Sequence, residues 1–253
     1  ISTIVAMLAA IAIITTGCLG GGTRPLGWSG VAASGDDLYF ATRDGTLYSI
    51  DNTNGNTRWQ YTLEKAQGVY SAPLVVDDAV YVSTYGGWIL ALNTAGTLKW
   101  TYPADNKLAD PVVSGLAYSD GKLFYGSDDG YVYALDAGSG TKIWEFETGK
   151  KIWATPVIEN GVLYIGSFDN NFYALSADTG EELWNFKADG VFTSAAVIEG
   201  NTIFFGSLDR NLYALDKNTG TQKWVFTADR WFWTTPVILD GVVYAPNTDN
   251  TVY

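Results

Sequence analysis

The residue types that most often carry catalysis are scarce in this chain of 253 residues. It contains no histidine, and Cys18 is its single cysteine. The absence of histidine excludes the usual general base, the Ser-His and Cys-His nucleophile systems and most zinc or copper sites. One cysteine also forms no intrachain disulfide. The sequence therefore favours binding over catalysis, and we predict no catalytic residues.

Acidic residues recur between pairs of short apolar runs, where they have two interpretations. They are either calcium ligands or the tips of tight hairpins, whose positive φ suits Asp, Asn and Gly. A calcium site needs about six or more oxygens that converge on one point, whereas hairpin tips on successive units diverge. We favour hairpins and predict no metal site. The dipeptides are Asp44-Gly45, Gly86-Gly87, Asp129-Gly130, Asp169-Asn170, Asp209-Arg210 and Asp249-Asn250.

A second set of residues offers aromatic rings and positive charges to a ligand. An aromatic recurs three residues before a proline position, and basic residues lie in two of the same connections. The rings have two interpretations: they pack between neighbouring units, or they form a circle of anchors for a peptide or small ligand. The loop charges likewise have two interpretations, solvation of the loops or contact with a partner. The candidate binding face comprises Trp28, Tyr70, Trp153, Phe192, Trp231, Trp233, Lys150, Lys151 and Arg230, with Leu108 at the aromatic position of the third unit.

The elements that must position these residues repeat at a fixed interval. The stretch "GSDDGYVYALDAGSGTKIW" at 126–144 returns forty residues later as "GSFDNNFYALSADTGEELW" and again as "GSLDRNLYALDKNTGTQKW". Each unit contains four short runs of alternating apolar and polar residues, rich in β-branched and aromatic side chains, which predict strands. Successive units are spaced by 41, 44, 40 and 40 residues when they are aligned on Trp59, Trp100, Trp144, Trp184 and Trp224.

Proline placement orders the strands within a unit. Pro73, Pro156 and Pro236 fall near the start of the first strand, and we place Pro111 at the same point of the third unit. Proline survives in sheets mainly at edges and strand starts, so the first strand should be a free edge facing a central channel. A β-sandwich does not explain the constant period. We therefore predict an all-β fold, a β-propeller of four-stranded antiparallel blades, with about six blades present and the last incomplete at Tyr253.

The segment "ALDAGSGTKIW" has the spacing A-x-D-x-x-x-G-x-x-x-W at Ala134, Asp136, Gly140 and Trp144. This pattern resembles the tryptophan-docking motif of the pyrroloquinoline-quinone (PQQ) repeat propellers, and the resemblance covers residues 27–253. It implies a parent of seven or eight blades, and so about 60 to 100 further residues at forty per blade. It also implies that the motif fastens neighbouring blades through Trp59, Trp100, Trp144, Trp184, Trp224, Gly55, Gly96, Gly140, Gly180 and Gly220.

The resemblance brings two functional classes into view. In PQQ-dependent alcohol and sugar dehydrogenases the propeller holds the quinone and a divalent cation above its axis. Non-catalytic relatives, such as BamB-like lipoprotein propellers, use the same blades for docking. The alcohol dehydrogenases use two adjacent cysteines and the membrane glucose dehydrogenases use histidine, and this chain has neither. We therefore expect a binding scaffold without a cofactor; PQQ with calcium enters only under the dehydrogenase alternative, and a structural cell-surface module is a third class.

The first residues read as an export signal. Residues 1–17 are apolar and then small, as in a signal peptide truncated at its start, and "TTGC" at 15–18 is similar to a lipobox that would lipidate Cys18. An ordinary signal peptide with a chance cysteine is the alternative. Residues 18–26 would form a Gly-rich tether before the propeller at 27–253. We expect an extracytoplasmic, lipid-anchored protein of the periplasm, outer membrane or archaeal surface.

The charge of the chain restricts its partners. Its formal net charge is −12, which repels nucleic acid and anionic lipid surfaces. The acidic surface suits solvation, a saline habitat or a basic partner. We expect a monomeric propeller that contacts the membrane through its lipid and binds an envelope protein or peptide.

Overall fold

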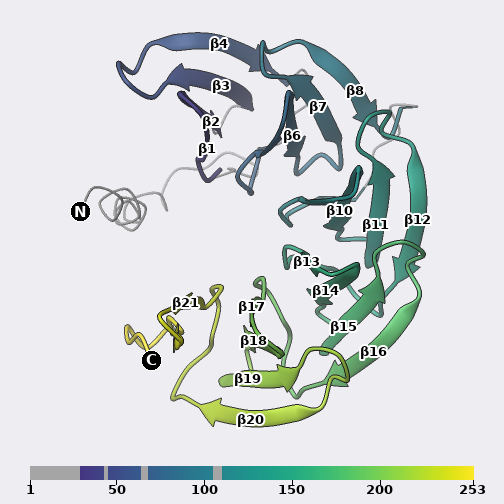
Figure 1. The fold of residues 1–253 in the computed structure, drawn as a ribbon, viewed down its shortest axis with the longest axis vertical. Helices are drawn as coiled ribbons and strands as arrows, with labels where there is room; N and C mark the ends of the chain where they lie inside the picture. Colours follow the sequence, from purple (N-terminus) through teal and green to yellow (C-terminus); the bar gives the residue numbers. More distant parts are fainter. Residues whose placement is uncertain (1–28, 43–44, 64–67, 105–109) are drawn as a thin grey trace, which may run out of the picture.

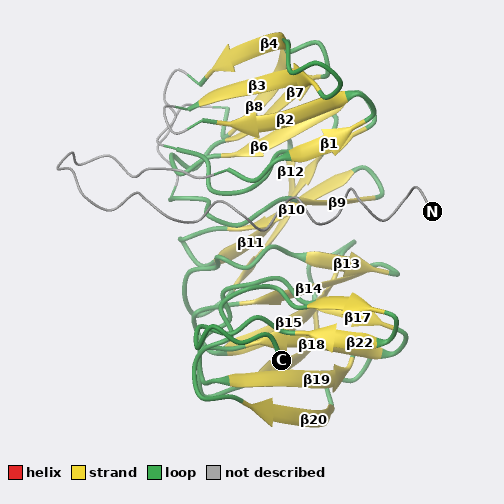
Figure 2. Ribbon diagram, turned by 90° about the vertical axis from the view of Figure 1, so that its left-hand side faces the viewer, coloured by secondary structure: helices red, strands yellow, loops and turns green. Residues whose placement is uncertain are grey.

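A computed structural model describes residues 29–42, 45–63, 68–104 and 110–253. These residues form successive antiparallel sheets that fan around a central axis, with the first strand of each sheet innermost and the fourth at the rim (Figure 1). The predicted β-propeller is confirmed. Seen from the side, the blades form a single layer around the axis (Figure 2). No helix occurs in the described ranges, and none there could cross a membrane.

Five sheets have four strands each and the sixth has two, extended by a bridge between Pro246 and Val252. The blades are, in chain order, β1(Ala32–Ser34), β2(Asp37–Ala41), β3(Thr46–Asp51), β4(Thr57–Thr62); β5(Leu74–Val76), β6(Ala79–Ser83), β7(Ile89–Asn93), β8(Leu98–Tyr102); β9(Ala117–Ser119), β10(Lys122–Gly126), β11(Tyr131–Asp136), β12(Lys142–Glu147); β13(Val157–Glu159), β14(Val162–Gly166), β15(Asn171–Ser176), β16(Glu182–Lys187); β17(Val197–Glu199), β18(Thr202–Gly206), β19(Asn211–Asp216), β20(Gln222–Thr227); and β21(Val237–Leu239), β22(Val242–Tyr244).

Burial follows the position of a strand in its blade. The second and third strands, such as β14 and β15, are buried over most of their length because neighbouring blades cover both faces. The rim strand β16 alternates between exposed and half-buried residues. The tight hairpins between second and third strands have the predicted positive φ, which reaches 72° at Asn170 and 76° at Arg210.

The motif tryptophans join each blade to the next one. Trp144, on β12, donates its indole Nε1–H to the carbonyl of Ala177 in the following blade at 3.1 Å. Its ring lies against Gly180 of that blade, where an added Cβ would come within 2.7 Å of Cε3. The same hydrogen bond is made by Trp59 to Thr94, Trp100 to Ala137 and Trp184 to Lys217, at 2.7, 3.1 and 3.0 Å.

The two ends of the repeat array depart from this contact. Gly55 has a φ of 75°, and the other motif glycines have φ values between 70° and 83°, but no atom of the described residues lies within 4 Å of the place where the Gly55 Cβ would be. Trp224 is 42% exposed, although its ring packs against Phe204 in the usual way. The motif glycine is therefore a receptor for the preceding blade's indole, and Gly55 receives none from the described chain.

Some sequence predictions fall outside the described residues. They are the signal peptide, lipidated Cys18 and tether, the hairpin residue Asp44, and the aromatic-position residues Trp28 and Leu108. These stay predictions.

Candidate functional site

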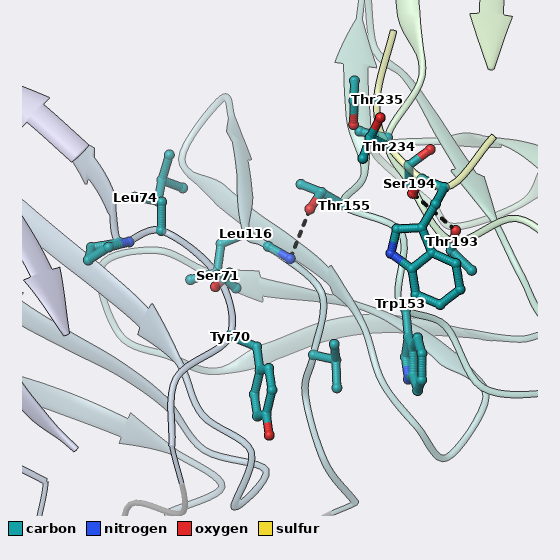
Figure 3. A pocket seen from close by; sticks show the side chains of 16 residues that line it. Tyr70, Ser71, Leu74, Leu116, Trp153, Thr155, Thr193, Ser194, Thr234 and Thr235 are labelled. Carbon is teal, nitrogen blue, oxygen red and sulfur yellow. Dashed lines mark hydrogen bonds between the residues drawn. The ribbon is translucent and has the colours of Figure 1, made fainter. Parts of the chain in front are cut away.

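A hollow of about 570 Å³ opens where the rim strand of one blade crosses to the inner strand of the next. Five consecutive blades line it, each through its crossing segment (Figure 3). One equivalent position per blade contributes a side chain, four residues before the inner strand begins: Tyr70, Val113, Trp153, Thr193 and Trp233. The sequence placed Tyr70, Trp153 and Trp233 in this set, and the structure brings them together.

Phe192 corrects the sequence-based assignment. It is fully buried in the core between blades, and the hollow is lined instead by its neighbour Thr193. The backbone shows the reason, because the N–H of Phe192 donates to the carbonyl of Ser167 at 3.3 Å, just as that of Ile152 donates to Ser127. Phe192 is thus equivalent to buried Ile152, not to Trp153. Its role is packing.

The third blade requires a similar correction. Its inner strand begins at Ala117, so Val113 occupies the aromatic position, five residues beyond Leu108. The structural equivalent of Pro156 is Leu116, and Pro111 lies further back in the crossing segment, where its carbonyl accepts from the N–H of Asp128. The longer spacing of 44 residues between Trp100 and Trp144 contains this extra length.

Trp153 is held firmly at the mouth of the hollow. Its Nε1–H donates to Asp128 Oδ1 at 2.8 Å, and its ring meets Phe168 edge-on at a centroid distance of 4.7 Å. The Lys151 ammonium lies 4.0 Å from the ring centroid, a cation–π contact. Burial raises the pKa of Asp128, against the opposing effects of the Trp153 hydrogen bond and of Lys151. These contacts therefore fix the orientation of the Trp153 ring in the lining of the hollow.

Trp233 adds an exposed ring beside Trp153. Its centroid lies 6.5 Å from that of Trp153, with an angle of 67° between the planes, and 44% of the residue is exposed. The two indoles form an open corner. Both indoles line the hollow.

Hydroxyl groups provide the polar part of the lining. Thr155 Oγ1 accepts a hydrogen bond from the Gly115 N–H at 2.9 Å and keeps its own proton to donate. Ser194 Oγ is buried and has no hydrogen-bond partner among the described residues. Figure 3 shows these groups gathered with Thr193, Thr234 and Thr235 on the Trp153 side, and Tyr70 across from them. Among the described residues that line the hollow, none carries a charged side chain.

The remaining candidates lie near the hollow without lining it. Lys150 and Arg230 are exposed in equivalent loops, and Trp231 is 52% exposed. The Arg230 carbonyl accepts from Asn247 Nδ2 at 2.8 Å. Lys151 contacts the site only through Trp153 and Phe168. These residues lie in the crossing segments 149–152 and 229–232, directly before the lining residues Trp153 and Trp233.

The hairpin aspartates are engaged in their own turns. Asp169 accepts hydrogen bonds from the Asn171 N–H, from the Gly149 N–H and from the Tyr173 hydroxyl at 2.8, 2.8 and 2.6 Å. The same tyrosine pairing recurs at Asp129, Asp209 and Asp249. Across the described part of the chain, no three acidic or thiol side chains converge to hold a metal. These carboxylates therefore stabilise the hairpins through hydrogen bonds.

Comparison with known proteins places the repeat in a family. Residues 19–113, 105–197 and 188–253 match the PQQ-like repeat family described as outer membrane protein assembly factor BamB. The chain belongs to this family. The matches run through all blades, including the crossing segments that line the hollow.

The relatives fall into two groups. The chain is 38% identical to the 1-butanol dehydrogenase (cytochrome c) of Thauera butanivorans over 36% of its length and 14% of that protein. It is 31% identical to BamB of Yersinia pestis over 51% of its length and 33% of that protein. The quinohemoprotein alcohol dehydrogenase structure from Comamonas testosteroni shares the fold, with a TM-score of 0.70 and 16% identity over 83% of this chain and 44% of that one. The matches thus span a third or less of the first two relatives.

The described lining does not fit a quinone with its calcium ion. PQQ is a tricarboxylic acid, and its carboxylates require basic partners, while calcium takes about six to eight oxygen ligands that include carboxylates. The lining offers hydroxyls, apolar side chains and three aromatic rings, with neither acid nor base. The donor set suits a neutral ligand.

Proposed function

We propose that this chain is a non-catalytic β-propeller that binds an envelope protein or ligand outside the cytoplasm, through the face that carries the hollow. The observation that supports this most is the uncharged aromatic corner of Trp153 and Trp233 at the axis. Exposed indoles contribute more to binding energy than most side chains do. Lipidation at Cys18 would anchor the propeller, which we take to be a monomer, to its membrane.

The loop charges around the hollow support protein docking on the same face. Lys150 and Arg230 project from equivalent crossings in a chain with a net charge of −12. Local positive charge on an acidic protein orients a partner during its approach. Similarity to proteins named outer membrane protein assembly factor agrees with a partner in the envelope.

Affinity capture of cross-linked partners tests this proposal. We expect the wild-type protein to retain a defined envelope protein, identified by mass spectrometry, and Lys150→Glu to retain less of it. Lys187→Glu is the matched control, because Lys187 is also exposed but lies on the rim strand β16. Equal recovery with all three proteins, or no envelope protein above background, would contradict docking through this face.

A quinoprotein dehydrogenase is the second candidate, favoured by the similarity to the butanol dehydrogenase. It would require the quinone and its cation to be held by residues other than the described lining. Saturable PQQ binding with turnover of an alcohol or aldose separates this candidate from the first.

A further inference from the structure

We infer that the axial hollow binds a neutral saccharide, stacked on Trp233 and held by the surrounding hydroxyl groups. This inference rests on the proposed binding function and specifies its ligand. The saccharide inference and the proposed function can be tested separately. A protein that captures an envelope partner but binds no saccharide would contradict the saccharide inference and leave the proposed function intact.

The charge of the lining restricts the ligand first. An ionised ligand loses hydration when it enters a hollow, and a counter-charge must compensate for that loss. The described lining has none, and the two charged groups that contact Trp153, Asp128 and Lys151, are both engaged by its ring. A neutral ligand bears no such cost.

The hydroxyl groups restrict it further. A serine or threonine hydroxyl donates one hydrogen bond and accepts up to two. Thr155 has a proton left to donate, and the hydroxyl groups of Thr234 and Thr235 belong to exposed residues of the lining. A saccharide hydroxyl is also donor and acceptor at once, so it satisfies both sides of these groups. A proline-rich peptide offers its carbonyls as acceptors and leaves the acceptor side of the lining unused.

The indole corner supplies the apolar contact. A pyranose ring presents a face of C–H groups, and a flat aromatic surface buries such a face well. Trp233 is 44% exposed, and Trp153 stands beside it at 67°, fixed by Asp128 and Phe168. Stacking on Trp233 therefore places the rim of the sugar toward Trp153 and the hydroxyl groups of the hollow.

The test is titration of the protein with maltohexaose, cellohexaose and hexa-N-acetylchitohexaose, which are all neutral, followed by calorimetry and tryptophan fluorescence, with decaproline as comparator. We expect at least one oligosaccharide to bind saturably. Trp233→Ala should weaken that binding about tenfold or more, while Trp231→Ala should leave it within about twofold. Trp231 is the matched control because it is an exposed indole two residues away that does not line the hollow.

Two further variants keep the test decisive. Thr235→Val should weaken binding without lowering the melting temperature, because its exposed hydroxyl lines the hollow and makes no hydrogen bond to another described residue. Trp233→Phe retains a ring and should give an intermediate affinity if the alanine variant fails to fold. Binding of none of the three oligosaccharides, binding of decaproline alone, or saccharide binding unchanged by Trp233→Ala and Trp233→Phe would each overturn the inference.

Discussion

The docking of an indole on the glycine of the next blade predicts a cost for Gly180→Ala that has two separable parts. The residue has a φ of 75°, where an alanine side chain is strained by about 1–2 kcal/mol. The new Cβ would also stand 2.7 Å from Cε3 and 2.8 Å from Cδ2 of Trp144, an overpacking that costs about 1–3 kcal/mol. We expect a total destabilisation of about 2–5 kcal/mol.

Gly55→Ala is the control for the backbone part. Gly55 occupies the same motif position with the same φ of 75°, but nothing lies within 4 Å of its prospective Cβ. This variant should lose only about 1–2 kcal/mol. The difference between the two variants therefore isolates the contact between the blades.

Urea unfolding, followed by circular dichroism and tryptophan fluorescence, measures both variants. Because repeat arrays do not always unfold in one step, the same transition must be compared in each protein. Combining Gly180→Ala with Trp144→Ala should remove the contact part, so that the alanine costs no more than it does at Gly55. Equal destabilisation by Gly180→Ala and Gly55→Ala would refute the docking argument.

Three further predictions concern the hairpins. Tyr173→Phe removes the hydroxyl that donates to Asp169 and should destabilise the protein by about 1.5–3 kcal/mol in chemical denaturation, as expected for a hydrogen bond to a charged group. Burial raises the pKa of Asp169, but the hydrogen bonds from Tyr173, Gly149 and Asn171 outweigh it and leave a lowered pKa. Stability from Asp169 is thus present above its unfolded-state pKa of about 3.9 and is lost as the pH falls through the lower folded value, so Asp169→Asn should flatten the fall in melting temperature between about pH 4.5 and about pH 2. Arg210→Gly should raise stability by about 0.5–1 kcal/mol, because glycine relieves a φ of 76°, and an unchanged or lower melting temperature would contradict this.

The fold could be predicted from the sequence because its information is repeated. The period of about forty residues, the alternation within each run and the glycines at hairpins all indicate the same blade. Prolines before the first strands correctly indicated which edge faces the axis.

The site was predicted in part. Trp153 and Trp233 could be found because each stands three residues before a proline that directly precedes an inner strand. In the fifth blade that proline is replaced by Ala196, and counting from the nearest aromatic selected buried Phe192. Counting back four residues from the strand starts Val157, Val197 and Val237 would have found Thr193.

Other features of the site depend on contacts that no local pattern encodes. Trp153 and Asp128 are 25 residues apart, and their hydrogen bond arises only from the crossing of two blades. The unpartnered state of Ser194 Oγ likewise follows from the direction of one side chain in the closed packing.

The most direct test of the central claim, that the axial hollow binds a neutral ligand and does not hold a quinone, is a calorimetric titration of the protein with PQQ in the presence of calcium. The lining predicts no saturable binding, and no quinone reduction when an alcohol or aldose is added. Saturable binding of PQQ with substrate-dependent turnover would contradict it.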